Sequence, residues 1–122
     1  MLSLAERGIT PSVVDDQHGR LTFTSELARA IRHLIETAAP FGLYNVTGAG
    51  PVMSWADVAR RVFASAGRDP DGVTGVSTEE YFRSAEGPVA PRPGNSVLNL
   101  TKIEATGFVP VDAAETLADY LA

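Results

Sequence analysis

Two amphipathic helical patterns, separated by short β-prone runs, constrain the fold of this chain more than any other feature. The apolar positions of the first pattern share one face of a helix and are Leu27, Ile31, Leu34 and Ile35. Thr24 or Ser25 is placed to cap that helix. The second pattern begins at Ser54, whose spacing to Asp57 is that of a capping box, and Gly67 is placed to end it. The apolar stripe of this second helix consists of Trp55, Val58, Ala59, Val62, Phe63 and Ala66. Because Trp55 belongs to this stripe, we expect it to pack in the core.

The remaining elements are all short. Alternating or β-branched residues predict strands at residues 12–14, 41–47 and 73–76, and a short extended piece at 97–98. Residues 2–7 predict one or two helical turns, and capping-box spacings that start at Ser77, Thr101 and Asp112 predict further helical segments. The sequence therefore predicts an α/β, α+β-like lobe in which short strands accompany three or four amphipathic helices. Because so few short strands make a marginal sheet, we expect the lobe to rest on a larger layer.

Length and composition narrow the class of protein. The 122 residues suit one domain, apolar residues make up 44%, and the net charge of −5 is unlike that of a nucleic-acid-binding surface. Cysteine is absent and only two histidines occur, which argues against a zinc site. No apolar run is long enough to span a membrane, and the first residues do not form a signal peptide. These features favour a soluble, cytoplasmic protein without nucleic-acid or membrane partners.

Common catalytic and phosphate-binding patterns are weak here. Asp15 and Asp16 are adjacent, so on a strand they face opposite sides, and they are best interpreted as turn residues. His33 falls within a helical pattern, and no nucleophile elbow is present. Gly48 to Pro51 occupies the position of a dinucleotide-binding loop, but Met53 stands where a third glycine is needed. A plain turn before a helix is the favoured interpretation of that segment.

The proline-rich segment around Arg92 is the strongest candidate for a binding element. Residues 84–96 hold several prolines and glycines and predict an irregular loop. Pro91 and Pro93 fix the backbone on either side of Arg92, which lowers the cost of ordering its guanidinium. A planar guanidinium matches phosphate oxygens. From the residues alone, a phosphate contact and a structural salt bridge remain equally plausible.

Three stretches of the chain carry a resemblance to a known family. Residues 13–22 (VVDDQHGRLT) resemble a V-x-D-Q-x-G-x-P-T segment. Residues 42–48 (GLYNVTG) with 54–59 (SWADVA) resemble G-x-Y-H-x-x-G followed by S-W-x-x-F-A. Residues 92–98 (RPGNSVL) with 102–108 (KIEATGF) resemble an R-P-x-x-S-x-L-D-x-x-K and G-F tail. In this order and spacing, the chain resembles the C-terminal part of the dTDP-4-dehydrorhamnose reductases, in the extended short-chain dehydrogenase/reductase family.

The resemblance implies a two-part reductase, of which residues 1–122 are a single C-terminal substrate-binding lobe. It implies that an N-terminal Rossmann domain, absent from this chain, binds NADPH and supplies a Tyr-x-x-x-Lys pair. The implied reaction reduces dTDP-4-dehydro-L-rhamnose to dTDP-L-rhamnose. The positions that match the family's dTDP-sugar-binding motifs are Arg92, Asn95, Gln17, Gly19 and Thr22.

No Tyr-x-x-x-Lys occurs in this chain, in which Lys102 is the sole lysine. The chain alone is therefore expected to be inactive. A second hypothesis is a non-catalytic, regulatory interaction module derived from the same family. It is favoured slightly by departures from the motifs, in which Leu21, Asn45 and Asn99 replace a proline, a histidine and an aspartate. A third is an excised folding unit, whose exposed apolar surface would drive homo-oligomerisation.

Overall fold

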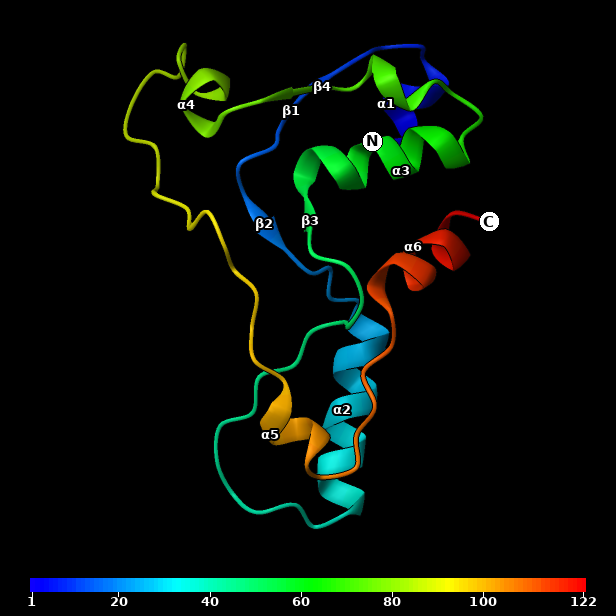
Figure 1. The fold of residues 1–122 in the computed structure, drawn as a ribbon, viewed down its shortest axis with the longest axis vertical. Helices are drawn as coiled ribbons and strands as arrows, with labels where there is room; N and C mark the ends of the chain where they lie inside the picture. Colours follow the sequence, from blue (N-terminus) through cyan, green and yellow to red (C-terminus); the bar gives the residue numbers. More distant parts are fainter. The chain divides into compact units, whose positions relative to one another are not determined.

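The computed structural model describes residues 1–122, which form two compact units (Figure 1). The first unit comprises Met1–Gly19, Val52–Ser96 and Leu121–Ala122, and the second comprises Arg20–Pro51 and Val97–Tyr120. The chain therefore leaves the first unit after Gly19, returns to it at Val52 and leaves it again after Ser96.

The first unit is built from two small sheets and three helices. Strand β1 (Ser12–Val14) pairs in parallel with β4 (Thr74–Val76), and β2 (His18–Gly19) pairs antiparallel with β3 (Met53–Ser54). The helices are α1 (Leu2–Glu6), α3 (Trp55–Ser65) and α4 (Thr78–Tyr81), with a 3₁₀ turn, η1, at Pro70–Gly72. The predicted strands at residues 12–14 and 73–76 and the predicted helices at 2–7, after Ser54 and after Ser77 are confirmed, the second strand one residue shorter.

Helix α3 has the ends that its sequence predicts. The Ser54 hydroxyl accepts a hydrogen bond from the Asp57 amide at 3.1 Å, and the Asp57 carboxylate accepts one from the Ser54 amide at 2.9 Å. This capping box satisfies two amides that the helix cannot pair internally. The bond from the Ser54 backbone lowers the pKa of the Asp57 carboxyl. Gly67 follows the helix with φ of +66°, a conformation that favours glycine.

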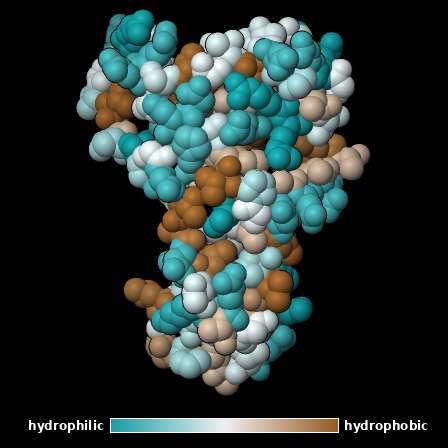
Figure 2. Space-filling view, in the orientation of Figure 1, coloured by the Kyte–Doolittle hydropathy of each residue, from teal (hydrophilic) through white to brown (hydrophobic).

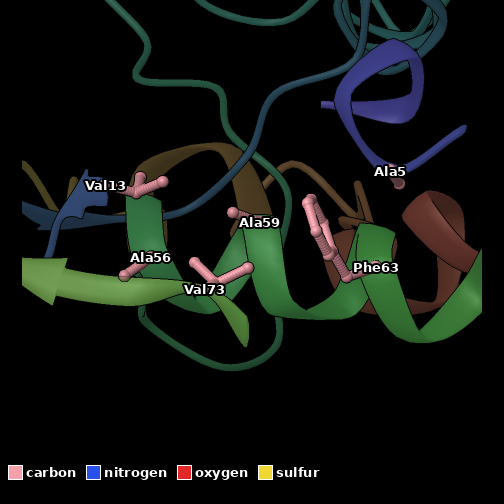
Figure 3. Close-up of a cluster of buried hydrophobic side chains, with 6 residues drawn as sticks. All are labelled: Ala5, Val13, Ala56, Ala59, Phe63 and Val73. Carbon is pink, nitrogen blue, oxygen red and sulfur yellow. The ribbon is translucent and has the colours of Figure 1, made fainter. Parts of the chain in front are cut away.

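The core of the first unit lies between α1, α3 and the parallel strands (Figure 3). Its buried members are Ala5, Val13, Ala56, Ala59, Phe63 and Val73. Alanines on the inner face of α3 let the helix approach the sheet closely. The prediction that Trp55 packs in the core is wrong: its side chain is 55% exposed, because the buried face of α3 begins one residue later, at Ala56.

The second unit packs α2 (Thr24–Glu36) against α5 (Thr101–Glu104) and the residues that follow α5. Its core contains Ala30, Leu100, Ile103 and Phe108. Helix α2 is confirmed, but of its predicted apolar stripe only Leu34 packs against the core, whereas Ile31 is 60% exposed and Ile35 is 74% exposed. The helix packs instead through a neighbouring face, on which Ala30 and the carboxylate of Glu26 are buried. Neither predicted cap is used, because Phe23 occupies the N-cap position without a side-chain bond.

Residues 41–47 do not form the predicted strand. Tyr44 and Val46 pack against the core of the second unit, whereas Phe41 and Leu43 are 109% and 92% exposed. The alternation expected of a strand is therefore present, but the segment belongs to neither of the two sheets. A strand requires a neighbour to pair with, and the second unit supplies none. The piece at residues 97–98 is also not assigned to a strand.

Of the N-cap residues predicted for the last two helices, α5 and α6 (Ala113–Leu121), one is confirmed and one is wrong. Helix α6 begins as predicted, because the Asp112 carboxylate accepts bonds from the amides of Ala114 and Glu115 at 2.7 and 3.2 Å. Thr101 does not cap α5: Leu100 is the N-cap residue. None of the helices is both long and apolar enough to cross a membrane.

Candidate functional site

A cavity of about 430 Å³ lies within the first unit, between β1, the start of α3, α4 and the proline-rich loop. Its lining residues are Met1, Ser12, Val13, Val14, Gln17, Trp55, Val58, Ala59, Tyr81, Phe82 and Arg92. Most of this wall is apolar or aromatic, and only a few polar groups face into it. A mostly apolar cavity with a few polar groups is typical of small-molecule binding sites.

Gln17 and Arg92 are the two motif-derived site residues that line this cavity. They are brought together from opposite ends of the first unit's sequence. Gln17 follows β1, and Arg92 lies in the loop over residues 84–96. This loop contains no helix and no strand, as its prolines and glycines predict. The sequence motifs predict that both residues bind the same ligand, and in the structure both line the same cavity.

Arg92 is exposed and forms no salt bridge within the chain. The structural salt bridge considered from sequence is therefore absent. The cavity lining includes no Asp or Glu, so the Arg92 guanidinium is not neutralised by the wall on which it lies. A free guanidinium on a wall without carboxylates favours an anionic ligand, although the chain as a whole carries −5.

Gln17 is held by a chain of hydrogen bonds outside the cavity lining. Its Nε2 donates to the Thr78 hydroxyl at 2.8 Å, and that hydroxyl donates to an Asp16 carboxylate oxygen at 2.5 Å. The Thr78 amide donates to the other carboxylate oxygen of Asp16 at 2.9 Å. The bonds from the Thr78 hydroxyl and amide lower the pKa of the Asp16 carboxyl. Asp16 is therefore a turn residue that accepts hydrogen bonds, as predicted, and it remains ionised at neutral pH.

Gly19 and Asn95 do not line the cavity. They lie instead where the proline-rich loop is attached to β2. His18 pairs with Asn95 in an isolated parallel bridge, in which the His18 amide donates to the Gly94 carbonyl at 2.9 Å and the Ser96 amide donates to the His18 carbonyl at 2.8 Å. A Cβ at Gly19 would lie 2.6 Å from the Ser96 hydroxyl oxygen. This attachment fixes one end of the loop that carries the cavity's arginine.

Thr22, the fifth motif-derived residue, belongs to the second unit and is exposed there. It is not among the residues that line the cavity of the first unit. The assignment of Thr22 to the binding site stays a prediction from the motif.

Sequence reasoning missed the aromatic wall of the cavity. Tyr81 and Phe82 lie at the end of α4, with ring centroids 5.0 Å apart in an edge-to-face arrangement, and Trp55 is the first residue of α3. All three are exposed or nearly so. One signal was available: a four-residue helix that ends in two aromatic residues, directly before a proline-rich loop, has too little apolar surface to bury them both.

The glycines that precede α3 do not fit a dinucleotide phosphate. The amides of Gly48 and Ala49 already donate to backbone carbonyls. Pro51 has no amide hydrogen, and a Cβ at Gly50, whose φ is +85°, would collide with the carboxylate of Asp112. Such a loop binds phosphate through free amides and without a nearby negative charge, so this segment is a turn, as predicted. The described residues also contain no cluster of His, Asp or Glu that could hold a metal ion.

The substitutions at the three family positions have structural contacts in the second unit. The Asn99 side chain accepts a bond from the Thr101 amide at 2.8 Å, as an aspartate also could. Asn45 donates to the Asn99 carbonyl at 3.2 Å, and the Leu21 carbonyl accepts from the Gly48 amide. These contacts give the Asn45 and Asn99 side chains a structural role. Nothing in the structure explains the leucine at position 21, because the carbonyl of a proline could accept the same bond.

Comparison with known proteins agrees with the motifs. The sequence is 37% identical over 121 residues to the spore coat polysaccharide biosynthesis protein SpsK of Bacillus subtilis, covering 99% of this chain and 40% of that protein. It is 34% identical over 115 residues to a dTDP-4-dehydrorhamnose reductase of Streptomyces griseus, covering 91% of this chain and 36% of that protein.

Solved structures give the same result for the fold. A dTDP-4-dehydrorhamnose reductase of Clostridium acetobutylicum superimposes with a TM-score of 0.83 at 31% identity, and one of Bacillus anthracis, in complex with NADP, with a TM-score of 0.80 at 30% identity. Each match covers 98% of this chain and 40% of the reductase chain. These matches confirm the mixed α/β fold, and the chain spans about 40% of the length of its relatives. The sequence model of the RmlD substrate binding domain matches residues 1–122, and the chain therefore belongs to that family.

Proposed function

We propose that this chain is the nucleotide-sugar-binding part of a cytoplasmic reductase that reduces dTDP-4-dehydro-L-rhamnose to dTDP-L-rhamnose with NADPH. The observation that carries this proposal is the cavity of the first unit, in which an Arg92 without an ion pair shares the wall with Gln17. The relatives named dTDP-4-dehydrorhamnose reductase support the choice of ligand.

The cavity has the chemistry that a nucleoside-diphosphate sugar requires. The guanidinium of Arg92 offers paired N–H donors to diphosphate oxygens, and the two flanking prolines reduce the entropy that is lost on binding. The rings of Trp55, Tyr81 and Phe82 offer apolar surface to a base or to the carbon face of a deoxysugar. Gln17 adds an amide that can accept from, or donate to, a sugar hydroxyl.

Reduction is assigned to a part of the enzyme outside this chain. Of the side chains that commonly act as general acids or bases, the cavity lining holds only Tyr81, and no lysine accompanies it. Lys102, the sole lysine, donates to the Leu43 carbonyl at 2.8 Å in the second unit. The proposed division of labour is that this chain binds the dTDP-sugar, while an N-terminal Rossmann domain binds NADPH and transfers its hydride. One relative is known as a complex with NADP.

The binding proposal is tested by titrating the ¹⁵N-labelled chain with dTDP, dTDP-L-rhamnose and thymidine. We expect dTDP and its rhamnose conjugate to bind with dissociation constants on the order of millimolar, because a single partial site supplies only a few kcal/mol. The shifted resonances should include Gln17, Tyr81 and Arg92, and thymidine should bind more weakly. No NADPH should be consumed. If saturating dTDP leaves these resonances unmoved, the chain does not have the proposed function.

We also propose that the apolar surface of the second unit is covered by the N-terminal Rossmann domain. The exposed residues that support this proposal are Leu27, Ile31, Ile35, Phe41 and Leu43. Hydrophobic residues are visible at the surface in the space-filling view (Figure 2). An exposed apolar helix face is a surface that normally has a partner.

The isolated chain is therefore expected to self-associate through this surface. Sedimentation velocity at increasing concentration should show dimers or larger species, and Ile31→Glu should shift the population to monomer. The matched control is Ser25→Glu, which makes the same change in net charge at another exposed position of α2. A wild-type chain that stays monomeric at high concentration would contradict this expectation.

The alternative function, a non-catalytic interaction module, predicts different results. Such a module would capture a stoichiometric enzyme partner and would not bind a nucleotide sugar. The side-chain contacts of Asn45 and Asn99 weaken the sequence argument for it, whereas the departure at Leu21 stands.

A further inference from the structure

The hydroxyl of Thr78 lies between Asp16 and Gln17 and makes two hydrogen bonds whose directions can be deduced. An ionised carboxylate only accepts hydrogen bonds, so the single proton of the Thr78 hydroxyl must point to Asp16. The same oxygen can then only accept from Gln17. Gln17 must therefore turn its NH₂ group toward Thr78, which fixes the side-chain amide in one of its two orientations.

The position of Thr78 is itself fixed from two sides. Its amide donates to Asp16 at 2.9 Å, so the two residues are joined by two bonds. Thr78 is also the first residue of α4, and the N-cap residue Ser77 accepts a bond from the Glu80 amide at 3.1 Å. The hydroxyl is therefore held in place before any ligand arrives.

The fixed amide leaves one acceptor of Gln17 available. Gln17 is half-buried on the wall of the cavity, and its Oε1 makes no hydrogen bond within the chain. We propose that Thr78 and Asp16 are positioning residues, which orient Gln17 so that its Oε1 accepts a hydrogen bond from a hydroxyl or N–H group of the ligand. This inference rests on the proposed function for the identity of the ligand, but the orientation of Gln17 can be tested without any ligand.

A purely structural role for Thr78 makes a different prediction. In that case the contact would only attach the turn after β1 to α4. The bond from the Thr78 amide to Asp16 makes the same attachment, and it survives in Thr78→Val. Valine has nearly the shape of threonine without its hydroxyl, so this variant removes the orientation of Gln17 and keeps the attachment.

The first measurement is the side-chain amide signal of Gln17 in the ligand-free chain. In the wild type we expect two well-separated, exchange-protected N–H resonances. They should move toward free-glutamine values in Thr78→Val and stay in place in Thr78→Ser. The control Thr74→Val removes a threonine hydroxyl in β4 of the same unit and should change nothing.

The second measurement is the affinity for dTDP-L-rhamnose. Thr78→Val should weaken binding about fivefold, Thr78→Ser should restore it, and Thr78→Val should have no additional effect in a Gln17→Leu background. An unchanged Gln17 signal in Thr78→Val, or independent effects of the two substitutions on affinity, would overturn the inference. Loss of binding in the wild type would instead overturn the proposed function, and the ligand-free signal would still decide how Gln17 is oriented.

Discussion

Replacing Arg92 with alanine is expected to weaken the binding of dTDP to this chain about 10- to 30-fold, as loss of one charge-assisted contact predicts. The guanidinium has no carboxylate partner to release, so its full hydrogen-bonding capacity is available to a diphosphate. Arg92 is exposed, which places the effect at the lower end of the range for charged hydrogen bonds. The change in dissociation constant can be measured by calorimetry or NMR titration.

Three controls separate a diphosphate contact from a general effect of charge. Arg92→Lys keeps the charge and loses the planar fork, so it should recover only part of the affinity. Arg83→Ala removes an exposed arginine that pairs with Glu80 and does not line the cavity, and it should have little effect. The affinity for thymidine should not change in Arg92→Ala. A folded Arg92→Ala variant that binds dTDP as well as the wild type would refute the assignment of this residue.

The parts of the fold that depend on local chemistry could be predicted from the sequence. The Ser54–Asp57 capping box, the left-handed Gly67 and the cap at Asp112 each involve residues within three positions of one another. Such interactions depend only on nearby residues, so they form regardless of how the rest of the chain folds. For the same reason the proline-rich loop over residues 84–96 was predicted correctly.

Two local predictions failed, because Phe23 and Leu100 occupy the N-cap positions expected for Thr24 or Ser25 and for Thr101. The other errors concern residues whose neighbours lie far away in the sequence. The stripe of Ile31 and Ile35 has helical spacing, yet α2 packs through Ala30 and Glu26, because only the three-dimensional arrangement determines which face meets α5. Residues 41–47 alternate as a strand does, but pairing requires a second strand that the second unit does not contain. Periodicity identifies a surface that needs a partner and does not identify the partner.

In the candidate site, too, residues in distinctive local segments could be predicted, whereas a residue that acts through a distant contact could not. The motifs predicted Gln17 and Arg92, because each lies in a distinctive segment. Thr78 could not be found in this way, since it lies 61 residues from the Gln17 side chain to which it bonds. The structure brings these segments together through the parallel pairing of β1 with β4, which places the start of α4 beside the turn after β1. The positioning role proposed for Thr78 is thus a consequence of sheet topology.

The largest expected loss of stability comes from Glu26→Ala in the second unit. The Glu26 side chain is 3% exposed and accepts bonds from Arg29 Nε and Nη2, both at 2.9 Å, and from the Val111 amide at 3.0 Å. Arg29 also donates to the Val109 carbonyl and lies 4.2 Å from the centre of the Phe108 ring. Glu26 therefore joins α2 to the segment before α6, and alanine would leave the Val111 amide without a partner.

We expect Glu26→Ala to lower the free energy of unfolding by about 3 kcal/mol, the lower end of the range for breaking a buried pair, because Arg29 is partly exposed. Glu26→Gln should cost less, about 1.5 kcal/mol, since its amide oxygen can still accept from the backbone. Glu36→Ala removes an exposed partner of Arg32 and should cost at most about 0.5 kcal/mol. Amide hydrogen exchange locates the effect: protection should fall in α2 and α5 and remain in α3. If Glu26→Ala leaves the exchange of α2 unchanged, the buried carboxylate does not hold the second unit together.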